Sequence, residues 1–297
     1  MKPQEWRDRG RSFSFGGHSI FYRDEGTGPV LLCLHGFPTA SWDWHRIWAG
    51  LTGRFRVVAP DMLGFGFSDK PRGHVYSIHE QATLHEELLA SLAIESAHLL
   101  AHDYGDTVAQ ELLARFAERR SQNATGLDIR SCCFLNGGLF PELHRPLPIQ
   151  SLLRSPFGFL VARLASERTF RKSFAKVFGP TTQPSAAELD EIYELVAHQD
   201  GLRIAHRLIR YIDDRRAHRN RWVGVLEDPP VPLRLVNGPE DPVSGRHAAE
   251  HYRRVVPNAD VVLLEAIGHY PQLEAPQETL RSFEQFHDRP PQGQHPQ

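Results

Sequence analysis

The feature that most constrains the fold of this chain is an abrupt change of pattern around residue 103. The apolar run Leu99–Ala101 is typical of a buried strand, and it stops at the turn His102–Gly105. A helical spacing of apolar residues begins directly afterwards, between Val108 and Phe116. A strand, a tight turn and a helix in this order hold the side chain at the apex clear of the backbone. The N–H groups at the helix start then point toward whatever that side chain attacks.

The residue at the apex is Asp103. A carboxylate is ionised near neutral pH and needs no base to make it a nucleophile. It suits attack on an sp3 carbon, which leaves an alkyl ester on the enzyme for water to cleave. The alternative interpretation is an aspartate that only caps the following helix.

An oxyanion site is predicted upstream of this turn. The strand-like run Val30–Leu34 is followed by Gly36, which allows a sharp turn, and by Pro38, which fixes the next dihedral. The backbone N–H of Phe37 is then free to point into a cleft. Together with the N–H of Tyr104 it would supply two donors for a developing negative charge. A simple turn at a strand end is the alternative.

A candidate general base lies near the C-terminus. The apolar run Val261–Leu264 is followed by a loop that carries Gly268, His269 and Pro271. Histidine is the natural general base near neutral pH. The chain has 17 histidines, so only this position, just after a strand, distinguishes His269 from the others.

An acid that orients this histidine is predicted between the Asp103 turn and the His269 loop. The strand-like run Leu233–Val236 ends in a Gly/Pro turn that contains Glu240 and Asp241. Asp241 is the candidate partner of His269, with Glu240 as the alternative and a plain turn as the other explanation. The chain order nucleophile, acid, histidine is that of the α/β-hydrolase fold.

The rest of the chain predicts a mostly parallel central sheet with flanking helices. A hairpin is expected around Gly16 and Gly17, and a helix capped by Ser77 is expected over 78–92. Strands that alternate with helices favour a parallel sheet, whose ligands bind at the carboxyl ends of the strands. Further strands are expected near 29–34, 55–59, 97–101 and 129–135, and a helix near 41–52.

Strand signals vanish from about residue 137 to 226, where helical patterns such as Ala186–Ala197 alternate with proline-rich turns. The sequence therefore predicts a core domain, 1–136 and 227–288, with a helical cap, 137–226, inserted over the site. The tail, 289–297, is expected to be disordered. Six apolar residues of the cap are expected either to line the substrate pocket or to form the core of the cap: Phe157, Phe159, Leu160, Phe170, Phe174 and Phe178.

These motifs together resemble the epoxide hydrolase and haloalkane dehalogenase branch of the α/β-hydrolase superfamily, over about residues 11–288. The resemblance implies an α/β-hydrolase fold, an aspartate nucleophile, a small apolar substrate and no cofactor. It is carried by His35–Pro38, Pro60–Pro71, Ala101–Asp106, Gly238–Pro242 and Gly268–His269. Three further stretches are especially similar to an animal lineage of this branch: His102–Leu112, Leu135–Pro146 and Arg221–Leu226.

The resemblance also bears on the reaction. Haloalkane dehalogenases hold the halide with side-chain N–H groups at positions that resemble Tyr104 and Phe37, and neither residue has such a group. Epoxide hydrolases use two cap tyrosines to protonate the ring oxygen, and Tyr211, 30 residues before Asp241, resembles the second. The first is absent, which leaves His144 and Tyr193 as candidates.

An epoxide hydrolase is therefore the function predicted first. A haloalkane dehalogenase and a catalytically silent ligand-binding protein are the alternatives. Asp106 stands where the branch usually has a small residue, and we expect it to crowd the turn or cap the helix and to act on Asp103 through its charge.

Composition supports one enzyme-sized unit of 297 residues. A formal charge of −2 gives no electrostatic reason to expect nucleic acid or an anionic membrane, and the basic run Arg215–Arg221 is interpreted as a solvated helix face. The three cysteines, Cys33, Cys132 and Cys133, lie in apolar runs and predict buried thiols in a cytoplasmic protein. No signal peptide, membrane span or metal-ligand spacing is visible. A homodimer remains open.

Overall fold

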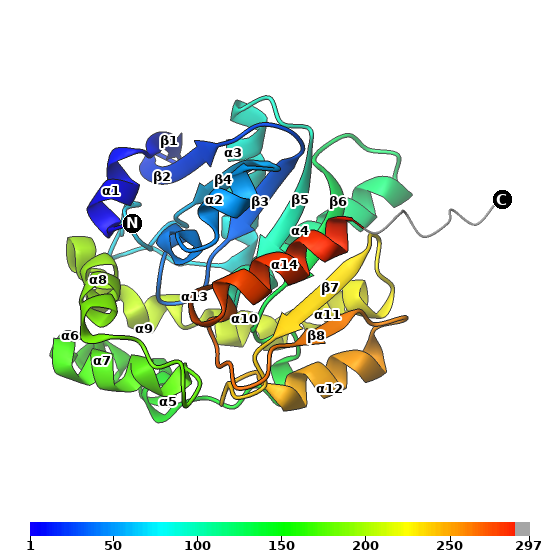
Figure 1. Cartoon of the computed structure of the whole chain (residues 1–297). Helices are drawn as coiled ribbons and strands as arrows, with labels where there is room; N and C mark the ends of the chain where they lie inside the picture. The colour runs from blue at the N-terminus through cyan, green and yellow to red at the C-terminus, as the bar shows by residue number, and fades with distance from the viewer. Residues whose placement is uncertain (289–297) are drawn as a thin grey trace.

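The computed structural model describes residues 1–288, so the tail predicted to be disordered, 289–297, lies outside the described residues. Its centre is an eight-stranded sheet with the order β1-β2-β4-β3-β5-β6-β7-β8 (Figure 1). The strands are β1 (Arg11–Phe15), β2 (His18–Glu25), β3 (Val30–Leu34), β4 (Arg56–Pro60), β5 (Ser96–Ala101), β6 (Asp128–Phe134), β7 (Leu233–Asn237) and β8 (Val261–Leu263).

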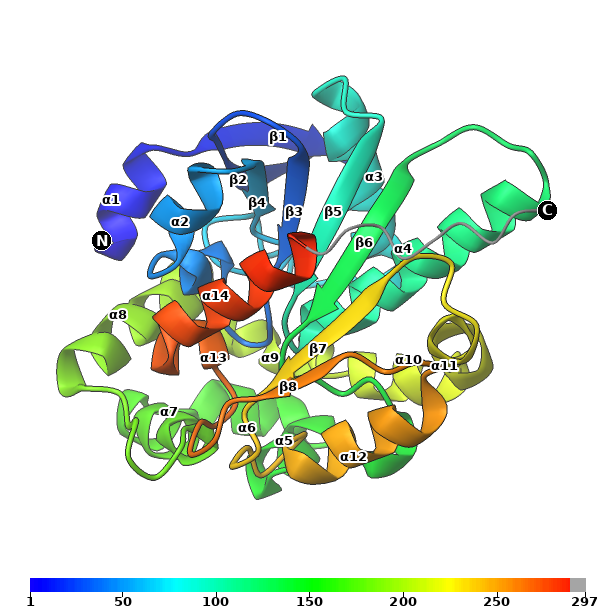
Figure 2. The ribbon, with the colours of Figure 1, turned by 45° about the vertical axis from the view of Figure 1, so that its right-hand side comes forward.

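The sheet is antiparallel only at one edge, where β2 pairs with β1 and with β4. The predicted hairpin joins β1 to β2 through Gly16 and Gly17, whose φ angles of 55° and 81° favour glycine. From β4 to β8 all neighbouring strands are parallel, so their carboxyl ends meet at one edge (Figure 2). Asp103, Asp241 and His269 all follow strands at this edge.

Helices pack on both faces of the sheet, and most of them follow the predicted pattern. Ser77 caps α3 as expected, because its Oγ accepts from the backbone N–H of Glu80 at 3.1 Å. The helix expected over 41–52 is divided into a 3-10 turn, Ser41–Trp44, and the short helix α2. The helices of the core are α1 (Pro3–Asp8), α2 (Trp48–Thr52), α3 (Ile78–Ser91), α4 (Tyr104–Ser121), α12 (Arg246–Val255), α13 (Pro271–Glu274) and α14 (Pro276–His287).

Between β6 and β7 the chain forms helices and no strand, and we call this segment, residues 135–232, the helical insertion. It lies across the edge of the sheet to which the arrowheads of the parallel strands point (Figure 2). None of the helices that residues 1–288 form is long and apolar enough to cross a membrane. The α-helices of the insertion are α5 (Pro148–Arg154), α6 (Gly158–Leu164), α7 (Glu167–Phe174), α8 (Ala186–Ala197), α9 (Ala205–Leu208), α10 (Tyr211–Ala217) and α11 (Arg219–Glu227).

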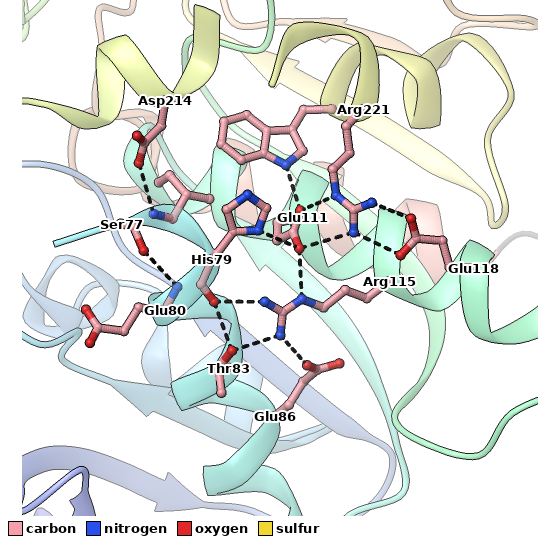
Figure 3. Close-up of polar contacts among 12 residues, drawn as sticks. Ser77, His79, Glu80, Thr83, Glu86, Glu111, Arg115, Glu118, Asp214 and Arg221 are labelled. Atoms are coloured by element: carbon pink, nitrogen blue, oxygen red, sulfur yellow. Dashed lines mark hydrogen bonds and ion pairs between the residues drawn. The ribbon is translucent and has the colours of Figure 1, made fainter. Parts of the chain in front are cut away.

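A buried carboxylate on α4 fastens the end of the insertion to the core (Figure 3). Glu111 accepts hydrogen bonds from Arg221 Nε at 2.7 Å and from Trp222 Nε1 at 2.8 Å, both on α11. On the core side it binds Arg115 Nε at 2.8 Å and lies 3.0 Å from His79 Nδ1. Burial would raise the pKa of Glu111, but these donors lower it to about 2, so the carboxylate stays ionised.

Candidate active site

The turn between β5 and α4 has a strained backbone. Asp103 adopts φ 49° and ψ −102°, a conformation that a residue other than glycine rarely occupies. The turn approaches β3 closely, because a Cβ on Gly105 would lie only 2.2 Å from the backbone oxygen of Leu34. Strain at a strand-to-helix turn is the structural signature of a nucleophile elbow.

The carboxylate of Asp103 faces a backbone donor from a different strand end. Phe37 donates its N–H to Asp103 Oδ2 at 3.0 Å. Asp103 does not cap α4, since its side chain makes no hydrogen bond to the helix start. Tyr104 is the first residue of α4, so its N–H has no acceptor within the helix. The predicted oxyanion donors therefore come from the loop after β3 and from the first residue of α4.

A histidine and a second aspartate form a buried pair next to this turn. His269 Nδ1 lies 2.7 Å from Asp241 Oδ2. The same carboxylate accepts from Ser244 Oγ at 2.7 Å, from Asn136 Nδ2 at 3.0 Å and from the backbone N–H of Val243 at 2.7 Å. With four donors the Asp241 carboxylate is fixed in position and can hold the imidazole in one orientation.

The electrostatics of this pair favour its charged form. Burial would raise the pKa of Asp241, but the charge of His269 and the hydrogen bonds lower it to about 2. Burial would lower the pKa of His269, but Asp241, and after it the charge of Asp103, raise it to about 9. The imidazole is thus protonated at neutral pH. Glu240, the alternative acid, is exposed.

Contacts from His102 and Glu274 hold the histidine loop in place. His102, the neighbour of Asp103, donates from Nε2 to the backbone oxygen of His269 at 2.8 Å. Glu274 accepts from the N–H of Gly268 at 2.9 Å and from the N–H of Gly179, in the insertion, at 2.7 Å. Glu274 was missed by sequence reasoning because its role depends on these distant backbone groups.

Asp103 and His269 line the same cavity, which has a volume of about 130 Å³. That is close to the size of an engineered apolar cavity that binds benzene. The lining residues also include the polar side chains of Gln150, Thr169 and Ser173. Tyr270 contributes its ring and its hydroxyl, and the apolar residues of the wall include Phe37, Pro38, Leu147, Ile149, Leu153, Val161, Ala162, Phe170, Phe174, Val177, Val196, Leu202 and Val243.

The six apolar residues predicted for the pocket or the cap core divide into three groups. Phe170 and Phe174 line the cavity. Phe178 is buried and stacks on Tyr270 in the core. The prediction is wrong for the other three, which are exposed on the outer side of the insertion: Phe157, Phe159 and Leu160. They lie next to or within a seven-residue helix, which is too short for its apolar spacing to define one face.

The three candidates for a ring-opening acid lie at different depths. Tyr211 is buried near Asp103, and its ring contacts that of Phe37 at 6.0 Å, but it does not belong to the cavity wall. Burial and then the charge of Asp103 raise the pKa of Tyr211, so its hydroxyl stays protonated. Tyr193 is half-buried and does not line the cavity. His144 lines a separate small cavity, and burial lowers its pKa to about 4.

Arg215 is a buried charge beside the turn that the sequence analysis assigned to a solvated face. It is 2% exposed, and it donates from Nε to Thr107 Oγ1 at 2.6 Å and from Nη2 to the backbone oxygen of Asp103 at 2.9 Å. Nη2 also lies 3.7 Å from Asp103 Oδ1. The overlooked signal was its spacing, because Arg215 follows Tyr211 by four residues and Ile212 by three and so continues their apolar face.

Asp106 behaves differently from the expectation. It is fully buried, and neither carboxylate oxygen has a hydrogen-bond partner among the described residues. Burial and then the charge of Asp103 raise its pKa well above the ordinary value, and its side chain does not cap α4. Asp106 does not crowd the turn, because the residue next to it is Gly137, which has no side chain. A Cβ at position 137 would lie only 2.1 Å from Asp106 Oδ2.

The fold and this arrangement of strand-end loops define a hydrolase of the α/β class. The model of the alpha/beta hydrolase family matches residues 31–282, so the chain belongs to this family. This confirms the fold class predicted from the motifs.

Among the relatives, the mesoderm-specific transcript homolog protein of Bos taurus is 45% identical over 95% of this chain and 86% of its own length. The putative hydrolase LipZ of Mycobacterium tuberculosis is 42% identical over 92% of this chain and 93% of its own. The first of these is a member of the animal lineage whose motifs the sequence resembles.

Solved structures show the same fold at lower identity. The haloalkane dehalogenase DbeA from Bradyrhizobium elkani has a TM-score of 0.78 and 23% identity, with 93% of this chain and 96% of that chain covered. The epoxide hydrolase CorEH has a TM-score of 0.73 and 20% identity, with 93% and 97% covered. Both groups that the sequence resembles, the haloalkane dehalogenases and the epoxide hydrolases, are therefore among the similar structures. At identities of 20–23% this similarity concerns the fold.

Proposed function

We propose that this protein is an epoxide hydrolase that forms a covalent ester through Asp103 and releases a vicinal diol. One observation carries the proposal. The residue at the strained elbow is an aspartate, its carboxylate accepts a backbone N–H from Phe37, and it shares an apolar cavity with a protonated histidine.

The protonation state of His269 supports an aspartate nucleophile. A serine in this position would need a neutral imidazole to accept its proton before attack. An aspartate needs no base in the first step, so a histidine with a pKa of about 9 does not impede it. In that step Asp103 bonds to a ring carbon, the carbon–oxygen bond of the epoxide breaks, and the ring oxygen takes up a proton.

We assign that proton to His269, because its imidazole is protonated and lies on the cavity wall. Tyr211, the acid predicted from the sequence, is the alternative donor, but it does not line the cavity that Asp103 and His269 share. His144 and Tyr193 have less support, since neither lines this cavity.

Loss of its proton in the first step leaves His269 able to act as the base of the second step. His269, now neutral and held by Asp241, takes a proton from water, and the resulting hydroxide attacks the ester carbonyl. The N–H groups of Phe37 and Tyr104 stabilise the oxyanion. The ester carries no charge, so the contribution of Asp103 to the high pKa of His269 is removed while the histidine acts as a base. Collapse of the intermediate frees the diol, and the Asp103 carboxylate and protonated His269 are restored.

The wall of the cavity favours a small, uncharged, apolar epoxide. Its described side-chain donors besides His269 are an amide and hydroxyls, from Gln150, Thr169, Ser173 and Tyr270, and it has no indole N–H to hold a halide. Haloalkane dehalogenation is therefore the second candidate. Halide release from a panel of bromoalkanes, without diol formation from epoxides, would promote it.

The decisive experiment measures diol formation from a panel of small epoxides by the wild type and by Asp103→Asn. The variant should lose steady turnover, whereas Asp106→Asn, a matched control three residues away, should keep it because Asp106 does not line the cavity. A single turnover in oxygen-18 water should then label the peptide that contains Asp103. Unimpaired diol formation by Asp103→Asn would contradict the mechanism.

The panel also tests the alternative of a silent binding protein. If epoxides, haloalkanes and esters all fail to turn over while an apolar ligand raises the melting temperature, the cavity binds without catalysis.

A further inference from the structure

The outer surface of the helical insertion is unusually apolar. Seven large hydrophobic residues are exposed among residues 1–288, and five of them fall within 152–164. Phe157 is 67% exposed and Leu164 is 79% exposed. Single exposed apolar residues are ordinary, but a gathered group of this kind marks a binding surface. The five residues are Leu152, Phe157, Phe159, Leu160 and Leu164.

The same stretch is strongly basic, although the chain as a whole is not. Residues 145–176 contain seven Arg or Lys and one acidic residue, a formal charge of +6 in a chain of −2. Arg154 and Arg171 are ion-paired with acidic side chains. The other five are exposed and have no ion pair within the described residues: Arg145, Arg163, Arg168, Lys172 and Lys176.

These features lie on the far side of the helices that close the cavity. α5, α6 and α7 gather at one corner of the molecule (Figure 1). Their inner sides contribute Leu153, Ala162 and Phe174 to the cavity wall. Their outer sides carry the exposed hydrophobic and basic residues of 145–176, and we call this the α5–α7 surface. Only one layer of short helices separates it from the cavity.

We propose that the α5–α7 surface docks this protein on the surface of an anionic phospholipid bilayer. The five hydrophobic side chains would enter the boundary between headgroups and acyl chains, and the five free cations would lie against lipid phosphates. The partner is inferred from complementarity, because an anionic bilayer presents phosphates to the unpaired cations and an apolar interior to the exposed hydrophobic side chains.

The inference does not depend on the proposed function, since it rests on exposure and charge alone. It also revises the expectation from composition. A net charge of −2 gave no reason to expect an anionic membrane, but the +6 of residues 145–176 is concentrated at one corner and the remaining chain carries −8. A local field of this kind attracts anionic lipid whatever the net charge.

The test uses the full chain in a flotation assay with vesicles of phosphatidylcholine, with and without phosphatidylserine. The protein should float with the vesicles that contain phosphatidylserine and much less with pure phosphatidylcholine. Raised salt should weaken the binding, because the attraction of the cations is screened.

Variants separate the apolar contribution from that of charge. Phe157→Ser combined with Leu164→Ser should weaken partitioning by at least about tenfold, as both side chains lose burial in the membrane. The matched control is Val75→Ser, which replaces an exposed hydrophobic residue, 81% exposed, outside the insertion and should bind as the wild type does. Arg163→Gln and Lys172→Gln should each weaken binding by about fivefold. Arg281→Gln, an exposed cation on α14, should not.

Three outcomes would overturn the proposal. The first is no binding to vesicles with phosphatidylserine at low salt. The second is an equal loss in Val75→Ser, which would show that any exposed hydrophobic residue suffices. The third is a wild-type dimer in sedimentation velocity that the Phe157 and Leu164 double variant converts to a monomer, without vesicle binding by either. That result would make this surface an interface between copies. Unchanged melting temperatures would show that the variants fold.

Discussion

At the scale of single residues, the largest difference from the sequence-based prediction is Arg215, which is buried beside Asp103 and does not lie on a solvated helix face. An arginine that is 2% exposed must be paired, because an isolated buried charge is very costly. Its hydrogen bonds go to the backbone oxygen of Asp103 and to Thr107, so it fixes the backbone at the elbow and places a positive charge 3.7 Å from the carboxylate. We regard Arg215 as a positioning residue that acts through Asp103.

Replacement of Arg215 by Met should therefore harm both stability and chemistry. Removing one member of a buried charged pair typically costs about 3–5 kcal/mol of unfolding free energy. We also expect single-turnover ester formation to slow by at least about tenfold, which corresponds to roughly 1.4 kcal/mol of activation free energy. Arg215→Lys keeps the charge but not the planar fork, so it should recover part of the ester formation rate. A normal rate in Arg215→Met, despite a lower melting temperature, would make the residue merely structural.

The pH profile of ring opening tests the donor that we assign. His269 has a pKa of about 9, so it is protonated below that pH and loses its proton above it. The rate of ester formation should stay level up to about pH 9 and then fall by about tenfold per pH unit. Tyr211, whose pKa burial raises, would sustain the rate to higher pH. Tyr211→Phe should accordingly change the rate by less than about tenfold, and a much larger loss would assign the proton to Tyr211 instead.

At the scale of elements, the sequence predicted the parts of the molecule that are set by local pattern. Short apolar runs predicted the strands from β3 to β8, and the loops after β5, β7 and β8 contain the candidate residues Asp103, Asp241 and His269. What failed depends on tertiary contacts. The seven-residue helices α5 and α6 are too short for their spacing to say which side faces the cavity. The burial of Arg215 depends on Asp103 and Thr107, more than a hundred positions away.

Glu111 is a buried acceptor in the polar contacts that attach α11 to α4 (Figure 3). Glu111→Gln should lower the unfolding free energy by about 1–3 kcal/mol at neutral pH, because the donors of Arg115, Arg221 and Trp222 lose a charged acceptor. The control is Glu118→Gln, which removes an exposed partner of the same Arg221 and should cost less than about 1 kcal/mol. Urea unfolding measures both.

The same carboxylate gives a pH dependence with a definite sign. The pKa of Glu111 is lowered from its ordinary 4.5 to about 2 in the folded protein. Its stabilisation is therefore complete above about pH 5 and is lost as the pH falls toward 2. The difference between wild type and Glu111→Gln should shrink over that interval. A difference that stays constant down to pH 2 would mean that the charge of Glu111 contributes nothing.

At the scale of the whole molecule, the helical insertion is joined to the core near its end and also at its middle. Near its end α11 binds Glu111. At its middle, Val177 accepts the backbone N–H of His269 at 2.8 Å, and Glu274 accepts from Gly179 while it also holds the histidine loop. The insertion therefore cannot detach without disturbing His269.

This linkage predicts that core and insertion unfold together. Calorimetry should give one transition with equal calorimetric and van't Hoff enthalpies, provided that unfolding is reversible. Glu274→Gln replaces an acceptor-only carboxylate by an amide, so some of its four N–H and O–H donors lose their partner. We expect it to lower the single melting temperature and the rate of ester hydrolysis together, since the same contacts hold the fold and the general base. Two separate transitions, or a melting temperature that falls while hydrolysis is unchanged, would show that the insertion moves independently of the histidine loop.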